Sequence, residues 1–495
     1  MTDDASRAAA QDENAATSAD KAEEPRDDLV VTRHEIDIDG AALRYTVTAG
    51  RIVLRKEQVA DDAFSGSKAT AEVFVVAYTL DDADPASRPV TFAFNGGPGS
   101  SSVWLHLGLL GPRRVLMGDA GELAPPPYGL GDNPQTLLRH SDLVFIDPVS
   151  TGFSRAVSGG KPGEFHGFTG DIESVGEVIR LWTTRGDRWM SPKFIVGESY
   201  GTVRAVAVAE RLQETHALTL NGLVLVSSVL DFGTQDFGQH RWDESCLNFL
   251  PTYTAIAHYH GKVKRRSLRA LVKEAEEYAA GDYPAVLRKG NRLTTKERAA
   301  AVRKLASLTG LSEDYVDRAD LRIEHWRFFG ELLRDERRTV GRLDGRFSGP
   351  MASAIAENMD ADPAHDAISG PYAAVFNHYV REELGFESDL PYEQISRRVD
   401  PWSYKDFEGR PIDVTPKLER AMRQNPHLRV HVAYGYYDGA TPHFAAEDVV
   451  AHLNLPDELR ANIEHAYYEA GHMMYVHEPT RRQQSRDLAA FVTRG

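Results

Sequence analysis

The sequence predicts an α/β fold in which a mostly parallel central sheet has an antiparallel N-terminal lead-in and is interrupted by a helical cap insertion. Three observations support this prediction. Short continuous apolar runs, typical of strands covered on both faces, recur with helix-length segments between them. Ahead of them apolar and polar residues alternate, as along antiparallel strands. Between residues 231 and 400 the buried-strand pattern stops, and it returns afterwards.

Residues 1–28 differ in composition from the rest of the chain. They are rich in Ala, Asp, Glu and Ser and contain almost no large apolar side chains. We therefore expect a disordered acidic tail. The segment has no apolar stretch of the kind found in a secretory signal or a membrane anchor.

Residues 29–230 are expected to form the first part of the core. The alternating lead-in segments are His34–Ile38, Leu43–Thr48, Arg51–Leu54 and Ala71–Tyr78. The continuous apolar runs are Val90–Phe94, Leu143–Ile146, Phe194–Val196 and Leu223–Val226. A helix-like segment at Thr202–Leu212 follows the third of these runs.

Residues 231–400 are charge-rich and helix-forming, which predicts a helical cap insertion. Thr294 and Glu297 have the spacing of a capping box that opens a helix. Residues 401–495 should complete the core, with strands at Leu428–Tyr434 and Ile463–Tyr468. One α/β domain split by an insertion is the simplest interpretation.

Composition narrows the classes of partner. The net charge of −16 over 495 residues argues against nucleic acid or an anionic membrane as the main partner. No segment approaches the roughly 18 uninterrupted apolar residues of a membrane-spanning helix. Cys246 is the single cysteine, so the chain forms no internal disulfide, which suits a reducing compartment. We expect a soluble, cytoplasmic protein; its oligomeric state does not follow from the sequence.

The stretch from Phe194 to Gly201 carries the strongest chemical signal. An apolar run leads into Gly-Glu-Ser-Tyr-Gly, and a helix-like segment follows. Strand, sharp turn and helix in this order expose the hydroxyl of Ser199 at the end of a sheet, as in a nucleophile elbow. The alternative is an ordinary loop serine, because a Gly-x-Ser-x-Gly pentapeptide occurs by chance.

A glycine-rich loop, Asn95–Ser102, follows the Val90–Phe94 run. Glycines let the backbone approach a substrate, and an N–H of this loop could form half of an oxyanion hole. The N–H of Tyr200, the residue after the predicted nucleophile, would form the other half. The alternative interpretation of the loop is a plain turn.

Two loops near the C-terminus supply the remaining catalytic groups. Asp438 directly follows a predicted strand and could orient an imidazole, although an Asp-Gly turn is the plain alternative. His472 lies in a glycine loop after the last strand, and His443 and His465 are its weaker competitors. The chain order Ser199, Asp438, His472 is that of the α/β-hydrolase fold.

Four motifs together resemble the serine carboxypeptidase family, and the chain resembles a bacterial-type cytoplasmic member. They are Phe94–Gly99, Phe145–Ser154, Gly197–Gly201 and Ala470–Met473. The resemblance implies an α/β-hydrolase fold and acyl transfer through a serine ester. It assigns Ser199 as nucleophile, His472 as general base, Asp438 as its orienting acid, and Gly97 and Tyr200 as oxyanion donors. It also implies that Asn95, Gly96 and Glu198 bind the terminal carboxylate of the substrate; this last assignment rests on the resemblance alone.

The sequence departs from the family at that carboxylate site. The family's second glutamate falls on Leu109, and Tyr475 stands where the family often has proline. An ionised Glu198 would repel an anionic terminus, whereas a buried, protonated one could donate a hydrogen bond to it. Arg113 and Arg114 could supply positive charge, or could simply face solvent.

The leading hypothesis is a serine carboxypeptidase-like hydrolase that cleaves C-terminal residues of peptides. The alternative uses the same triad as an esterase or acyltransferase on a small metabolite. A non-catalytic binding protein on a hydrolase scaffold is the third possibility, and the complete set of triad residues argues against it. No metal or other cofactor is expected, because no metal-ligand spacing, phosphate loop or dinucleotide motif is present.

Overall fold

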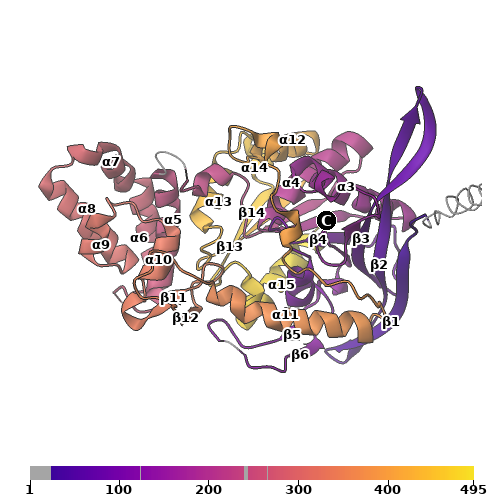
Figure 1. The fold of residues 1–495 in the computed structure, drawn as a ribbon, viewed down its shortest axis with the longest axis horizontal. Coiled ribbons are helices and arrows are strands. Elements are labelled where there is room, and N and C mark those ends of the chain that lie inside the picture. The colour runs from indigo at the N-terminus through magenta and orange to yellow at the C-terminus, as the bar shows by residue number, and fades with distance from the viewer. Residues whose placement is uncertain (1–23, 123, 239–242, 265, 495) are drawn as a thin grey trace, which may run out of the picture.

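The structure, a computed structural model, describes residues 24–122, 124–238, 243–264 and 266–494. Its centre is a ten-stranded sheet in the order β1-β2-β3-β7-β4-β9-β10-β13-β14, with β8 paired to β3 (Figure 1). β1 to β3 and β7 pair antiparallel, and all pairs from β7 to β14 are parallel. The predicted mostly parallel sheet with an antiparallel lead-in is confirmed. Residues 1–23 of the predicted acidic tail lie outside the described residues.

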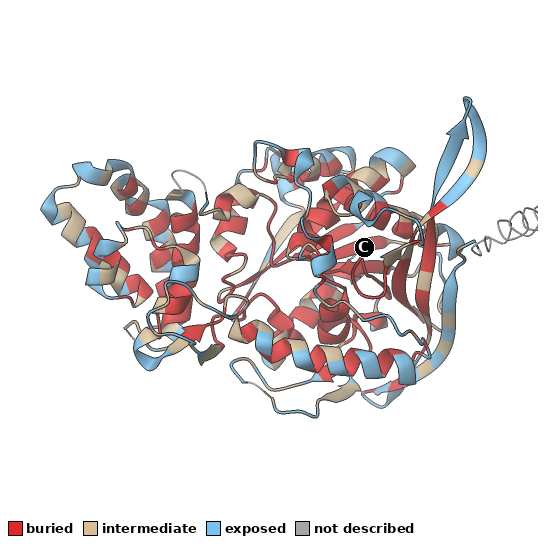
Figure 2. Cartoon of the chain, viewed as in Figure 1, coloured by how far each residue is buried: buried red, intermediate tan, exposed pale blue. Residues whose placement is uncertain are grey.

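The strands of this sheet match the predicted runs closely. They are β1 (Asp28–Ile38), β2 (Ala41–Ala60), β3 (Ala63–Leu80), β4 (Val90–Phe94), β7 (Asp142–Ile146), β8 (Arg155–Ala156), β9 (Lys193–Glu198), β10 (Gly222–Val226), β13 (Arg429–Gly435) and β14 (Ile463–Tyr468). A two-stranded sheet of β5 (Arg113–Leu116) and β6 (Gly129–Asp132) was not predicted. The end of β2 and the start of β3 form an exposed hairpin arm that projects from the rest of the molecule (Figure 2).

Helices cover both faces of the sheet. Alternate residues of one strand enter opposite clusters: Phe92 packs in one and Ala93 in the other. The first cluster is covered by α3 (Phe168–Arg185), α4 (Tyr200–His216), α12 (Thr415–Gln424), α13 (His443–Ala451) and α14 (Asp457–Arg460). The second is covered by α2 (Val103–Leu105), the π-helical turn η1 (His106–Leu110), α11 (Pro363–Glu382) and α15 (Glu478–Thr493). Burial on both faces explains why the core strands are continuously apolar.

The predicted insertion consists of two parts in space. One part has a hydrophobic cluster of its own and forms a separate lobe (Figure 1). Its helices are α5 (Asp243–Tyr259), α6 (Leu268–Ala280), α7 (Asp282–Lys289), α8 (Thr295–Thr309), α9 (Glu313–Arg318) and α10 (His325–Glu331), followed by the hairpin β11 (Arg338–Val340) and β12 (Ser348–Pro350). The capping box of Thr294 and Glu297 opens α8, as predicted. The other part, α11, packs back on the sheet through residues such as Tyr372 and Phe376.

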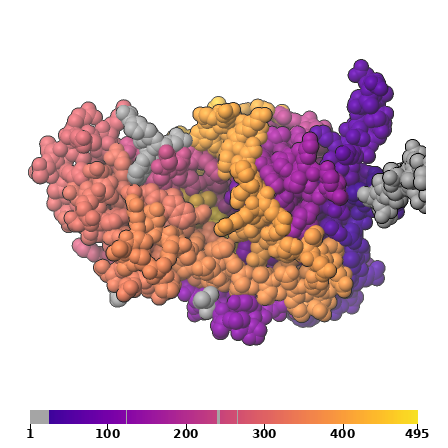
Figure 3. All heavy atoms as spheres, in the orientation of Figure 1, coloured from indigo at the N-terminus to yellow at the C-terminus, as the bar shows by residue number. Residues whose placement is uncertain are grey.

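Short 3-10 turns complete the described chain: η2 (Leu137–Arg139), η3 (Pro162–Glu164), η4 (Phe232–Gln235), η5 (Gly290–Arg292), η6 (Arg334–Glu336), η7 (Arg397–Val399), η8 (Lys405–Phe407) and η9 (Met474–Val476). Among the described helices, none combines the length and apolar character needed to cross a membrane. The space-filling view shows this face hollowed between the lobe of the insertion and the chain segment that leads into α12 (Figure 3).

Candidate active site

Ser199 occupies a strained turn between β9 and α4. Its backbone has φ +61° and ψ −130°, and its N–H donates to the carbonyl of Val226 at 3.0 Å. A Cβ atom at Gly197 would lie 2.1 Å from the carbonyl oxygen of Gly201, so this turn requires glycine. α4 begins at Tyr200, directly after the serine and two residues before the predicted start. The predicted elbow is therefore present, with the strain that such turns store at functional sites.

Asp438 and His472 form a buried pair at the ends of neighbouring strands. β13 and β14 pair in parallel, so the loops that follow them meet at one edge of the sheet. Nδ1 of His472 lies 2.8 Å from Oδ2 of Asp438. The same Oδ2 accepts a hydrogen bond from the Thr441 hydroxyl at 2.7 Å, while Oδ1 accepts from the N–H groups of Ala440 and Thr441. The carboxylate is fully buried and holds the imidazole in one orientation.

Neighbouring charges outweigh burial in setting the direction of the pKa shifts of His472 and Asp438. Burial alone lowers the pKa of His472, but the Asp438 carboxylate, its hydrogen bond and Glu198 outweigh burial and raise it above 6.5. The positive charge of Arg342 opposes that rise. Burial also works to raise the pKa of Asp438, yet His472 and the Thr441 hydroxyl hold it below its ordinary value. Asp438 therefore stays ionised, as an orienting acid must.

Ser199 and His472 line the same cavity of about 300 Å³, together with Asn95, Gly96, Gly97 and Glu198. The hydrogen bonds of the described residues do not include one between the Ser199 hydroxyl and His472. In enzymes without substrate this contact is often long and tightens when substrate binds. A second cavity, also lined by Ser199, lies on the side of Tyr200.

Two backbone N–H groups are available as oxyanion donors. The Asn95–Gly97 loop approaches the elbow so closely that a Cβ at Gly96 would lie 2.4 Å from the backbone nitrogen of Tyr200. Gly97 has φ +104°, which also favours glycine. Within the described residues, neither the Gly97 nor the Tyr200 N–H has a hydrogen-bond acceptor. Such free donors beside the serine fit an oxyanion hole.

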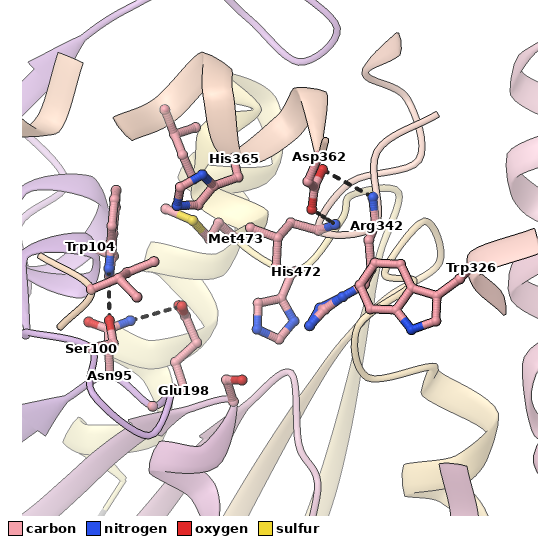
Figure 4. Close-up of a pocket in the computed structure, with 16 residues that line it drawn as sticks. Asn95, Ser100, Trp104, Glu198, Trp326, Arg342, Asp362, His365, His472 and Met473 are labelled. Atoms are coloured by element: carbon pink, nitrogen blue, oxygen red, sulfur yellow. Dashed lines mark hydrogen bonds between the residues drawn. The ribbon is translucent and has the colours of Figure 1, made fainter. Parts of the chain in front are cut away.

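Glu198 is buried next to the serine and bonded on both oxygens. Asn95 Nδ2 donates to its Oε1 at 2.8 Å (Figure 4). The Tyr475 hydroxyl donates to its Oε2 at 2.8 Å. Burial raises the pKa of Glu198 to about 7, against the lowering effects of His472 and of these two hydrogen bonds. Glu198 is therefore mostly protonated below neutral pH. The sequence left open whether Glu198 is ionised or protonated, and this pKa makes the protonated form accessible.

Leu109, at the position of the family's second glutamate, is buried in η1 and brings no charge to Glu198. Two tyrosines fill the neighbouring space. A Cβ on Gly108 would lie 2.4 Å from ring atoms of Tyr475 and 2.5 Å from the hydroxyl of Tyr372. A phenol thus serves as the partner of Glu198 in place of a second carboxyl group. Tyr475 was noted in the sequence only as a departure from the family.

A loop of the insertion, residues 341–347, braces both catalytic loops and was missed by the sequence analysis. The N–H of Gly439 donates to the carbonyl of Arg342, and the N–H of His472 donates to the carbonyl of Leu343. Asp344 in this loop forms a buried pair with Arg346 at 2.6 Å and packs on Gly471. No local motif could reveal these contacts, because they join residues far apart in the chain.

The arginines considered from the sequence lie outside the site. Arg113 pairs with Asp132 and Glu383, and Arg114 pairs with Glu478 at 3.0 Å. Neither arginine lines a cavity at Ser199. The suggestion that they reach the site as positive groups is therefore not supported, because both side chains pair with acids outside these cavities.

The competing histidines also lie elsewhere. His465 is bonded to Tyr434, and His443 to Glu276. Among the described residues, Glu276, His443 and Glu447 have ligand atoms within 4.8 Å of one another, a geometry that could hold a metal ion. No motif in the sequence indicated this group, because Glu276 comes from α6 and the other two residues from α13. The group lines neither cavity at Ser199.

Comparison with known proteins places these features in a family. A model of the serine carboxypeptidase family matches residues 65–485. Serine carboxypeptidase-like 45 and 34 of Arabidopsis thaliana are 23% and 25% identical over 206 and 193 residues, which are 38% and 33% of this chain. These matches span only 42% and 34% of the two plant proteins. The crystal structure of Kex1(delta)p, a prohormone-processing carboxypeptidase from Saccharomyces cerevisiae, has 17% identity, a TM-score of 0.56 and 90% coverage of each chain. That similarity supports the same fold.

Proposed function

Since this chain belongs to the serine carboxypeptidase family, we propose that it is a serine hydrolase that removes C-terminal residues from peptides. The observation that carries the proposal is the shared cavity, in which Ser199 and His472 lie beside a protonatable Glu198. The two curated relatives come from a plant, so they do not support a bacterial-type member.

The geometry suits acyl transfer in two steps. The Ser199 oxygen attacks the scissile carbonyl carbon while His472 Nε2 takes the hydroxyl proton, and Asp438 stabilises the resulting imidazolium. The N–H groups of Gly97 and Tyr200 hold the negative oxygen of the tetrahedral intermediate. His472 then returns the proton to the leaving amine, which leaves an acyl ester on Ser199. Water, deprotonated by His472, hydrolyses that ester and restores the hydroxyl.

Recognition of a free C-terminus follows from Glu198. A protonated carboxyl donates a hydrogen bond to the terminal carboxylate, and an ionised one repels it. His472 must be neutral to act as base, so activity on any substrate rises with pH through its raised pKa. Terminal-carboxylate binding weakens as pH rises through about 7. For a free-acid peptide these two titrations therefore change the rate in opposite directions as pH rises.

We predict that the preference for free over amidated C-termini is greatest below pH 7 and falls above it. Once Glu198 ionises, the kcat/KM ratio of a matched free-acid and amide peptide pair should drop by up to about tenfold per pH unit. Glu198→Gln, which is neutral at every pH, should make the ratio independent of pH. A ratio that is flat in the wild type, or equally pH-dependent in the variant, would contradict this role.

Tyr475→Phe should shift that pH dependence upward. The Tyr475 hydroxyl stabilises the ionised form of Glu198, so its removal raises the pKa of the carboxyl group. The midpoint of the free-acid preference should move up by about one pH unit. Tyr372→Phe is the matched control, because its hydroxyl lies in the same wall but makes no hydrogen bond to Glu198 among the described residues. A midpoint that stays in place or moves down in Tyr475→Phe would refute the prediction.

The second candidate function is that of an esterase or acyltransferase on a small metabolite. Leu109 favours it, because the carboxyl pair associated with terminal-carboxylate binding in the family is absent. The same peptide pair separates the candidates: a carboxypeptidase prefers the free acid, whereas an esterase cleaves small acyl esters and ignores the peptide terminus.

We also propose a cytoplasmic location. The support is the single cysteine, Cys246, which is buried and unable to form an internal disulfide. Fractionation of cells that express the full chain tests this proposal. Recovery outside the cytoplasmic fraction would refute it.

A further inference from the structure

The catalytic cavity contains a cation that the proposed mechanism does not use. Arg342 lines both cavities that adjoin Ser199. Its Nη1 is buried and has no hydrogen-bond partner among the described residues. Within the same residues no carboxylate forms an ion pair with its guanidinium; Asp362 accepts from the backbone N–H groups of Arg342, Leu343 and Ala364, and not from the Arg342 side chain. Arg342 is half-buried, and a buried N–H donor of a cation that lacks a partner costs free energy unless a ligand supplies one.

The guanidinium is presented in an orientation that suits a carboxylate. Its carbon lies 5.4 Å from the ring centroid of Trp326, so one face is stacked. Stacking leaves the planar edge, with its N–H donors, free to form two parallel hydrogen bonds to an anion. Of the other arginines, Arg410 also lines the second cavity, but it is exposed to solvent.

The backbone holds Arg342 firmly in this place. Its N–H donates to Asp362 Oδ1 at 3.1 Å, and its carbonyl accepts from Gly439 at 2.9 Å, next to the triad residue Asp438. A cation fixed before the substrate arrives loses little entropy on binding.

The position of Arg342 differs from that of the Glu198 site. In Figure 4, Asn95 and Glu198 lie on one side of His472, and Arg342 with Trp326 lies on the other. A substrate that spans the catalytic residues can therefore meet a hydrogen-bonding carboxyl group at one end and a guanidinium at the other.

We propose that Arg342 and Trp326 form an anion subsite that binds a carboxylate of the substrate. This inference rests on the proposed acyl transfer at Ser199. Two groups carry the required chemistry: an acidic side chain on the residue before the scissile bond, and the terminal carboxylate itself. Arg342 is thus a specificity-determining residue that the insertion contributes to the core.

Two matched substrate pairs test the subsite and identify its ligand. One pair has Glu or Gln before the scissile bond, with a free C-terminus in both; the other has a free or amidated C-terminus and neutral side chains. The kcat/KM ratio of each pair is measured below pH 7 for the wild type, Arg342→Gln and Arg337→Gln. Arg337 is exposed, belongs to the same insertion and lines neither cavity, so its variant controls for the lost charge.

For one of the two substrate pairs, the kcat/KM of the acidic substrate divided by that of the neutral one should fall about 10- to 100-fold in Arg342→Gln. The same ratio should be retained in Arg337→Gln. The pair that responds identifies the carboxylate. If Arg342→Gln fails to fold, Arg342→Lys should lower the same ratio, because an ammonium cannot form the paired bonds of a guanidinium. Retention of both ratios in the Arg342 variant, or no acid preference in either wild-type pair, overturns the subsite. Loss of wild-type hydrolysis in Ser199→Ala tests the proposed function separately from these ratios.

Discussion

Ser199→Ala is expected to abolish covalent labelling by a fluorophosphonate and to lower kcat about 10⁴- to 10⁶-fold. The serine lies in a turn whose positive φ and glycine neighbours serve to expose one hydroxyl. His472 and Gly97 line one cavity with the serine, Gly97 and Tyr200 line the other, and the N–H groups of Gly97 and Tyr200 are free among the described residues. Removal of the nucleophile leaves those N–H groups intact, so a small residual rate over water should remain. Gel labelling and steady-state hydrolysis of a peptide and an ester substrate measure the effect.

Ser100→Ala is the matched control for this experiment. Ser100 lines the same cavity, but its hydroxyl accepts a hydrogen bond from Trp104 and donates to the carbonyl of Ser101. With no imidazole to activate it, Ser100 should not react, and the variant should still be labelled at Ser199. Equal labelling of the wild type and Ser199→Ala would place the nucleophile elsewhere and remove the basis of the proposed function.

The core strands were predictable because two-sided burial leaves a local signature. Val90–Phe94 and Ile463–Tyr468 were predicted to the residue, and β9 extends its predicted run by one residue at the start and two at the end. The prediction of the antiparallel lead-in was less accurate. Leu43–Thr48 and Arg51–Leu54 are parts of one long strand, β2, whose bulges are features of its pairing with β3. Pairing partners leave no trace in the pattern of a single strand.

The residues of the site also divide into those that local sequence patterns predict and those that they do not. Ser199, Asp438 and His472 could be inferred because each follows a strand in a recognisable loop, and parallel strands bring such loops to one edge. Thr441, Tyr475 and Arg342 could not, since their roles depend on contacts across the fold. Arg113 and Arg114 show the converse error. Proximity in sequence suggested a place at the site, but both side chains pair with acids outside it and line neither cavity.

Asp438→Asn is expected to lower kcat about 10⁴-fold while the fold is retained. The carboxylate accepts the Nδ1–H of His472, which leaves Nε2 free to take the proton of Ser199. An amide in the same place can donate to Nδ1, and this stabilises the tautomer with the proton on Nε2. That tautomer cannot act as base. The amide also lacks the negative charge that raises the pKa of His472, so the midpoint of the pH–rate profile should fall.

Thr441→Val separates the charge of Asp438 from its positioning. The Thr441 hydroxyl donates to Asp438 Oδ2, but two backbone N–H groups still fix the other oxygen. This variant should therefore lose only about tenfold in kcat, the effect of one hydrogen bond to a charged group. Kinetics over the full pH range, with unfolding midpoints for all three proteins, measure both effects. If Asp438→Asn kept more than about a tenth of wild-type kcat, the pair would be structural, and the base at Ser199 would have to be another group.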